Sequence, residues 1–110
     1  MKNIHIVLLS ILAYSIATSA NAGKKYRGDW GNNSKTSLEI RSEKPLVVRY
    51  CFRRECSLHE PRGTVRSMTI RFPARGDFRG AKLTFKKSGN SYLGRYKRRG
   101  ETRVYRATLR

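Results

Sequence analysis

Acidic residues are scarce in this chain, and their scarcity constrains what it binds. The 110 residues contain 7 Asp and Glu against 25 Lys and Arg, which gives a formal net charge of +18. Solubility needs only a few net charges, and so large an excess of one sign destabilises a small domain by self-repulsion. The composition therefore favours an anionic partner and disfavours a basic one.

Residues that bind metals or carry redox chemistry are also few. After residue 22 the chain has one histidine, His59, and two cysteines, Cys51 and Cys56. A zinc site needs three or four such ligands, and the C-x-x-C redox motif is absent because four residues separate the cysteines. Glycine-rich phosphate loops and the G-x-S-x-G and H-E-x-x-H motifs are missing too. The sequence predicts no metal site, no cofactor and no catalytic residue.

The nearest approach to a catalytic group is the adjacent pair His59 and Glu60, close in sequence to Arg53, Arg54 and Arg62. Small secreted ribonucleases combine a histidine, a glutamate and arginines, which supply a base, an acid and cations for the transition-state charge. Adjacent residues on a strand point in opposite directions, so only a loop would bring these two side chains together. A nuclease-type enzyme is therefore the least favoured function.

Long apolar runs are absent except at the N-terminus. Residues 1–22 combine a positive start, an apolar run over about 4–17 and the small-x-small pattern of residues 20–22, as in a secretory signal peptide. The run is shorter than the roughly 20 apolar residues of a membrane span. We expect cleavage near Ala22, a periplasmic or secreted location, and one small domain over residues 23–110 with no integral membrane span.

The remaining chain lacks any long helical pattern. Short runs that alternate apolar and polar residues, rich in aromatic and β-branched side chains, are separated by turns that carry Gly or Pro. They predict seven strands, with one helical turn as an option in 56–63. The strands are 25–30, 37–41, 46–52, 65–72, 80–86, 92–97 and 103–109. The short connections predict an all-β fold, an antiparallel up-and-down meander that closes into a small barrel or tight sandwich to avoid open edges.

Alternation sorts the strand residues into an apolar face and a basic one. The expected core is Leu38, Ile40, Val48, Tyr50, Phe52, Met68, Ile70, Phe72, Leu83, Phe85, Tyr92, Gly94, Tyr96, Tyr105, Ala107 and Leu109. Like charges opposite one another on neighbouring strands are destabilising, so a repeated basic face predicts a bound anion. The alternative is a solvated face along which the side chains lie. The expected anion-binding residues are Arg49, Arg53, Arg54, Arg62, Arg71, Lys82, Lys86, Arg95, Lys97, Arg98, Arg99 and Arg106.

The segment CFRREC holds both cysteines at the end of a predicted strand. Four intervening residues suit a hairpin loop, across which two cysteines come within bridging distance. Because exported proteins keep disulfides, we predict a bridge between Cys51 and Cys56 that adds about 2 kcal/mol of stability. It would hold the two loop arginines beside Arg62 and His59, so we expect reduction to weaken anion binding before the domain unfolds.

Gly28-Asp29-Trp30 has the G-x-W form found in the first strand of lipocalins and avidins, together called calycins. The final segment LGRYKRRGETRVYRATLR resembles the last hairpin of such barrels, where a basic residue packs on the tryptophan; Arg103, Arg106 or Arg110 would take that place. The resemblance implies an up-and-down barrel with its first strand beside its last. The chain departs from calycins in being short for eight strands and in lacking an avidin-type set of ligand contacts.

These observations favour a secreted or periplasmic cationic binding module that docks a polyanion through outward Arg and Lys. The anion would be lipopolysaccharide, another anionic surface, an acidic glycan, a nucleic acid or an acidic protein surface. The alternative that follows from the resemblance is a calycin-like barrel that binds a small ligand. A barrel this small tends to be filled by its own side chains.

Overall fold

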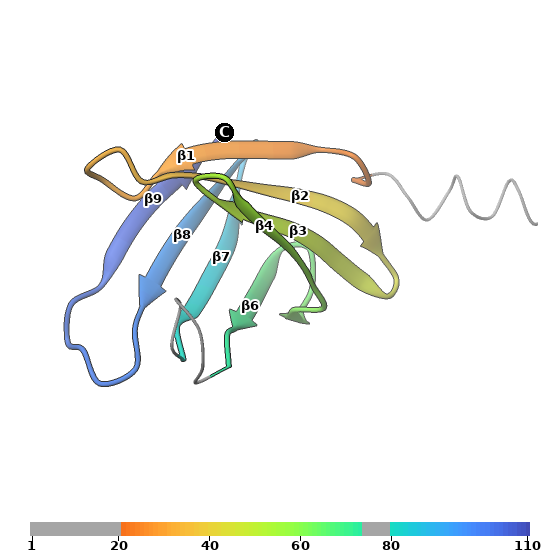
Figure 1. Ribbon diagram of the computed structural model, residues 1–110. Helices are drawn as coiled ribbons and strands as arrows, with labels where there is room; N and C mark the ends of the chain where they lie inside the picture. Colours follow the sequence, from red (N-terminus) through yellow and green to blue (C-terminus); the bar gives the residue numbers. More distant parts are fainter. Residues whose placement is uncertain (1–20, 74–79) are drawn as a thin grey trace, which may run out of the picture.

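The computed structural model describes residues 21–73 and 80–110, and the regular structure within these ranges is all β, as predicted (Figure 1). The strands are β1 (Lys25–Asp29), β2 (Lys35–Glu43), β3 (Leu46–Phe52), β4 (Glu55–His59), β5 (Arg62–Gly63), β6 (Ser67–Arg71), β7 (Lys82–Ser88), β8 (Ser91–Lys97) and β9 (Tyr105–Leu109). The apolar run of the predicted signal peptide and part of the 73–77 turn lie outside the described residues.

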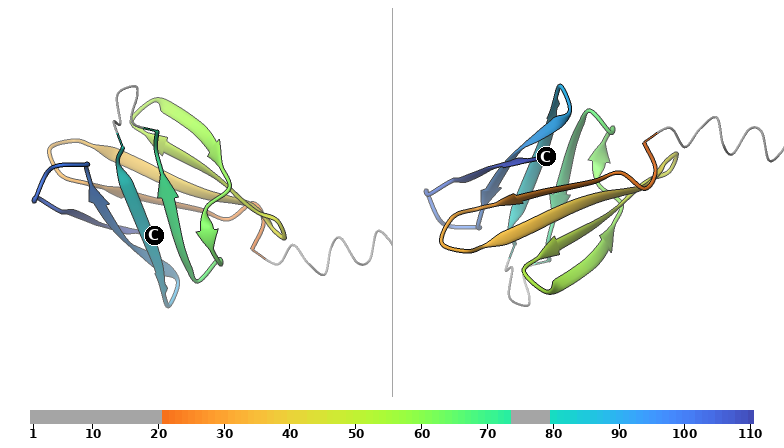
Figure 2. Two further views of the ribbon diagram at one scale, coloured as in Figure 1. Left: turned by 90° about the horizontal axis from the view of Figure 1, so that it is seen from below. Right: turned by 90° about the horizontal axis from the view of Figure 1, so that it is seen from above.

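Two antiparallel sheets build the fold. The N-terminal sheet has the order β1-β2-β3-β4, and the C-terminal sheet has the order β5-β6-β7-β8-β9. Each pairing joins strands that are neighbours in the sequence, as in the predicted meander. The described residues hold nine strands instead of the expected seven, because β4 and β5 form in the stretch where no strand was predicted. One sheet lies over the other, and their strands cross at a steep angle (Figure 2). Each sheet therefore has one face toward the core and one toward solvent.

The two sheets meet where β1 runs beside the end of β9. The Arg27 N–H donates to the Arg110 carbonyl at 3.0 Å, and the Arg110 N–H donates to the Arg27 carbonyl at 2.8 Å. Gly28 permits this approach, because a Cβ atom at that position would lie 2.5 Å from the Thr108 carbonyl oxygen. The strands β4 and β5 end the two sheets on their other sides.

Aromatic side chains from both sheets fill the space between them. Tyr50, Phe85 and Tyr92 are the largest fully buried residues. The Trp30 ring lies 6.3 Å from Phe85 and 5.8 Å from Tyr96 between ring centroids, and its indole N–H donates to the Tyr50 hydroxyl at 2.9 Å. The tryptophan of the G-x-W motif thus belongs to the core and has its polar atom satisfied.

The predicted core is confirmed with small differences. Phe52, Phe72 and Tyr105 are half-buried, while the other predicted core residues are buried. The helical turn suggested for residues 56–63 is wrong, because β4 and β5 occupy this stretch. Its residues pair with β3 and β6, so backbone hydrogen bonds to neighbouring strands replace those of a local turn.

Candidate polyanion-binding face

The outward side chains of the C-terminal sheet form three rows that run across its strands. Residues in a row lie directly opposite one another. The first row is Arg71, Lys82 and Lys97; the second is Arg62, Thr69, Thr84, Arg95 and Arg106; the third is Ser67, Lys86, Leu93 and Thr108. Neighbouring rows are two residues apart along each strand, a separation of about 7 Å.

We call the cations of these rows, together with the two arginines that follow β8, the basic face. Its members are Arg62, Arg71, Lys82, Lys86, Arg95, Lys97, Arg98, Arg99 and Arg106, and all are exposed. Nine of the twelve predicted anion-binding residues are thus gathered on one side of the molecule. The other three lie on the N-terminal sheet or at its β3–β4 turn.

Like charges lie directly opposite one another on the basic face. Lys82 of β7 faces Arg71 of β6 on one side and Lys97 of β8 on the other, and Arg95 of β8 faces Arg106 of β9. No carboxylate belongs to any of the three rows, all of whose residues are described. Opposed like charges destabilise a strand pair. The basic face therefore lowers the stability of the unbound protein.

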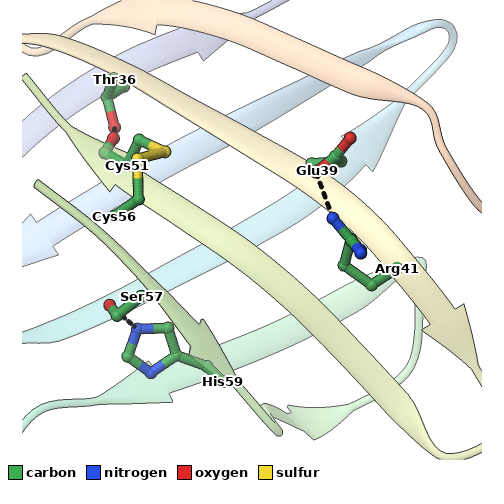
Figure 3. Close-up of a disulfide and its surroundings, with 7 residues drawn as sticks. All are labelled: Thr36, Glu39, Arg41, Cys51, Cys56, Ser57 and His59. Carbon is green, nitrogen blue, oxygen red and sulfur yellow. Dashed lines mark hydrogen bonds and ion pairs between the residues drawn. A yellow bond between two sulfur atoms is a disulfide. The ribbon is translucent and has the colours of Figure 1, made fainter. Parts of the chain in front are cut away.

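On the N-terminal sheet the cations have acidic neighbours on the adjacent strands. Glu39 lies directly between Lys25 and Arg49 in the register, and its carboxylate also pairs with Arg41 at 3.4 Å (Figure 3). A second acid, Asp29, lies opposite a lysine of β2. The outer rows of the N-terminal sheet therefore contain both signs of charge, while the three rows of the C-terminal sheet contain a single sign.

Two hollows lie in the basic face. The first has a volume of about 500 Å³ and is lined by five cations and no acid: Arg71, Lys82, Lys97, Arg98 and Arg99, with Phe72, Gly80 and Gly100. Arg98 donates from Nε to the Tyr96 hydroxyl at 2.9 Å, and this hydrogen bond raises the pKa of Arg98 above its ordinary value. The guanidinium group is therefore charged and held at the rim.

The second hollow, of about 660 Å³, lies over the second and third rows. Four hydroxyl groups line it beside three cations: Ser67, Thr69, Thr84 and Thr108, with Lys86, Arg95 and Arg106. Its one lining carboxylate is Asp29, whose Oδ1 accepts the Gly31 N–H at 2.6 Å. Hydroxyl and guanidinium donors in one hollow are suited to a phosphate or sulfate oxygen.

The hydroxyl residues of the second hollow were missed by sequence reasoning. Thr69 and Thr84 share the strand alternation of Arg71 and Lys82, so the signal that placed the cations outward also placed the threonines. Only the register of the sheet shows that the hydroxyls lie between arginines in one row. Threonine is common on strands for its shape alone, and its presence gave no reason to select it.

The predicted disulfide is present. Cys51 and Cys56 lie directly opposite each other on β3 and β4 with Cα atoms 4.0 Å apart (Figure 3). The segment from Glu55 to His59 is extended, so Arg54 and His59 lie roughly 16 Å apart. The expected grouping of the loop arginines with His59 is therefore wrong, because a strand separates them.

We expect removal of the disulfide to lower stability without weakening anion binding. Replacing both Cys51 and Cys56 by Ala should lower the free energy of unfolding by about 2 kcal/mol, measured by urea denaturation. Retention on heparin should be unchanged, because the basic face lies on the other sheet. Weaker retention would show that Arg53 and Arg54 contribute, as the sequence alone suggested.

His59 is half-buried on the core side of β4. Its Nε2 lies 2.7 Å from the Ser57 hydroxyl oxygen (Figure 3). Its ring packs edge-on against Phe72, with the two ring centroids 5.0 Å apart. Burial lowers the pKa of His59 below 6.5. A serine–histidine contact alone does not make a nucleophile, because catalysis also needs an orienting acid and oxyanion donors. Within 21–73 and 80–110 no group of His, Cys, Asp and Glu is placed to hold a metal ion.

The lowered pKa of His59 predicts an acid-sensitive contribution to stability. The unfolded chain takes up the proton at a higher pH than the folded one. The contribution of neutral His59 to the free energy of unfolding is therefore complete above about pH 6.5, and it is lost as the pH falls through the pKa of His59 in the folded protein. We expect the melting temperature of the wild type to fall more steeply than that of His59→Gln between about pH 7 and 5. Parallel curves would contradict this.

Comparisons with known proteins do not assign the chain to a family. No family model, curated protein sequence or solved structure matches the chain. The described part of the chain also contains no helix with the length and apolar character needed to cross a membrane. The basic face therefore has to be interpreted from its own chemistry.

Proposed function

We propose that the protein is a cationic binding module that docks a polyanion on the basic face. The observation that carries the proposal is the register of the C-terminal sheet, which sets Lys82 opposite Lys97 and Arg95 opposite Arg106. Where an acid separates two bases, as Glu39 does on the other sheet, the charges stabilise the strand pair. On the basic face, an anion lying over the rows would supply the missing countercharge.

The alternative of a small ligand held between the sheets has less support. The largest fully buried side chains occupy that space, with Phe85 lying 5.9 Å from Tyr50 and 6.5 Å from Tyr92 between ring centroids. The second hollow is lined mainly by outward residues of the C-terminal sheet, and the first by residues at the ends of β6, β7 and β8. A nuclease-type activity is also less supported, because His59 lines neither hollow of the basic face.

We also propose that the two sheets form a partly open barrel of the calycin kind. The support is the pair of backbone hydrogen bonds between Arg27 and Arg110, which sets the first strand beside the last, and the burial of Trp30. Arg103 lies over the Tyr105 ring, with its Cζ atom 4.7 Å from the ring centroid. This arginine therefore packs on a tyrosine and not, as the resemblance implied, on the tryptophan.

We propose in addition that the protein is exported and cleaved near Ala22. The strands begin at Lys25, so cleavage there leaves each described strand whole. The Gly23 amide that becomes the new N-terminus already donates to the Ile40 carbonyl at 2.6 Å. The mass of the protein from a periplasmic or culture fraction tests this, and an uncleaved product would contradict it.

The test of the proposed function compares two variants with the same loss of charge. One carries Arg95→Gln, Lys97→Gln and Arg106→Gln on the basic face; the other carries Lys25→Gln, Lys35→Gln and Arg49→Gln on the N-terminal sheet. We expect wild type and the second variant to leave immobilised heparin at similar high salt, and the first at clearly lower salt. Melting temperatures verify that both variants are folded.

Two results would overturn the proposal. Equal loss of retention in the two variants would show that only net charge matters and that the basic face has no special part. Failure of the wild type to bind heparin, nucleic acid or anionic vesicles at low salt would remove polyanion binding altogether.

A further inference from the structure

We propose that the polyanion is duplex nucleic acid, held through its phosphates without recognition of the bases. The inference rests on the proposed function and narrows its partner to one class. Three properties carry it: no aromatic ring lies in the three rows, no apolar belt crosses them, and the donors of the basic face have the density and type that a duplex needs.

The three rows contain no aromatic side chain. The sheet has aromatic residues, but Phe85, Tyr92 and Tyr96 point into the core, where they are buried. Surfaces that bind single strands stack unpaired bases on exposed aromatic rings. A duplex keeps its bases stacked inside and presents phosphates, so it needs no such rings. The basic face is therefore suited to paired rather than unpaired nucleic acid.

The basic face also lacks the apolar residues that insert into a membrane surface. Leu93, which is 48% exposed, is the one large apolar side chain in the three rows. The other large apolar side chain that is strongly exposed among residues 21–73 and 80–110 is Leu58, which belongs to β4 on the other sheet and is 64% exposed. Proteins that lie on a bilayer bury a broader apolar face together with their cations. An anionic lipid surface is thus the weaker candidate.

The density of cations matches a duplex. Three strand spacings and three rows make the basic face about 15 Å across in each direction. Duplex DNA carries one negative charge per about 1.7 Å of axis, so this length presents about nine charges, of which roughly half face the protein. The basic face therefore offers enough cations to contact each facing phosphate.

The donors are those that contact phosphodiesters. In the second row two threonines lie between Arg62 and Arg95, and in the third Ser67 and Thr108 flank Lys86 and Leu93. Arg, Lys, Ser and Thr are among the side chains that hydrogen-bond phosphate and sugar oxygens without reading sequence. Rows about 7 Å apart are comparable with the separation of successive phosphates on one strand.

Fluorescence anisotropy with a labelled 20-base-pair duplex tests the inference. Competitors are a duplex of different sequence, the single strand of the same length, a heparin fragment of equal charge and phosphatidylserine vesicles. We expect both duplexes to bind equally and to be preferred over the other competitors. The logarithm of the binding constant should fall with the logarithm of salt concentration with a slope of about −4, as for four or five phosphate contacts.

Matched variants locate the contacts. Arg95→Gln with Arg106→Gln should reduce the magnitude of the salt slope by about two, whereas Lys25→Gln with Arg49→Gln should leave it unchanged. A variant that is expected to bind more tightly is a useful control, because misfolding would weaken binding and would not strengthen it. Asp29→Asn removes the one carboxylate that lines the second hollow, yet keeps an oxygen for the Gly31 N–H, so duplex binding should become a few-fold tighter.

The outcomes separate this inference from the proposed function. If the single strand, heparin or vesicles displace the duplex at equal or lower concentration, the duplex assignment is overturned while polyanion binding stands. If the two duplexes bind with clearly different affinities, binding without recognition of the bases is overturned, while the proposed polyanion binding stands. If none of these ligands binds at low salt, both proposals fail together.

Discussion

Lys97→Glu is expected to raise the melting temperature while weakening polyanion binding by about tenfold or more at low salt. Lys97 lies directly opposite Lys82, so the substitution turns a like-charged strand pair into an oppositely charged one. Such pairs differ by roughly 0.2–1 kcal/mol, which corresponds to a rise of a few degrees in a domain of this size. Binding falls because one cation is lost and a carboxylate is placed within the first hollow. Thermal melts and heparin elution measure the two effects.

Arg49→Glu is the mirror-image control. It makes the same change in net charge, but it sets a glutamate opposite Glu39 on the N-terminal sheet. We expect this variant to melt at a lower temperature and to keep most of its affinity. A drop in melting temperature for Lys97→Glu, combined with wild-type binding, would contradict both the register and the function assigned to the basic face.

Gly28→Ala is expected to destabilise the domain by about 3 kcal/mol or more. The added methyl would lie 2.5 Å from the Thr108 carbonyl oxygen and 3.2 Å from the Leu109 side chain. A backbone atom of a paired strand cannot move aside alone, so the contact between β1 and the end of β9 must open. Urea denaturation gives the change in the free energy of unfolding.

Gly94→Ala supplies the comparison. The methyl there would lie 2.9 Å from Cη2 of Trp30 and 3.1 Å from Cε1 of Phe85. Ring edges can shift by a few tenths of an ångström, so we expect a smaller cost of about 1–2 kcal/mol. If Gly94→Ala proved the more damaging of the two, the close approach of β1 to β9 would be in doubt.

Much of the fold could be predicted because one signal sets both faces of a strand. The period of two that buries Met68, Ile70, Leu83 and Phe85 also turns Lys82 outward. Tyr26 carried the same signal, since it alternates with Gly28 and Trp30, and it is buried as well. Strand β4 gave no such signal. Its residues are mostly exposed, and it is recognisable only by its pairing with β3.

The candidate site needed information that no local pattern contains. Alternation shows that Arg49 and Arg95 both point outward, but it does not show that they lie on different sheets. It also does not show that an acid neighbours the first and an arginine the second. These facts depend on which strands pair and in what register, and the alternation within a single strand specifies neither.

The order of the strands has a consequence for how the chain folds. Each strand pairs with its neighbour in sequence, so these hairpins form with short loops and little loss of chain entropy. The mutual hydrogen bonds of Arg27 and Arg110 close almost the whole chain into a ring. We therefore expect the hairpins to assemble first and the ends to meet last. In pulsed hydrogen exchange the amides of Arg27 and Arg110 should become protected after those of β7 and β8, and earlier protection would contradict this order.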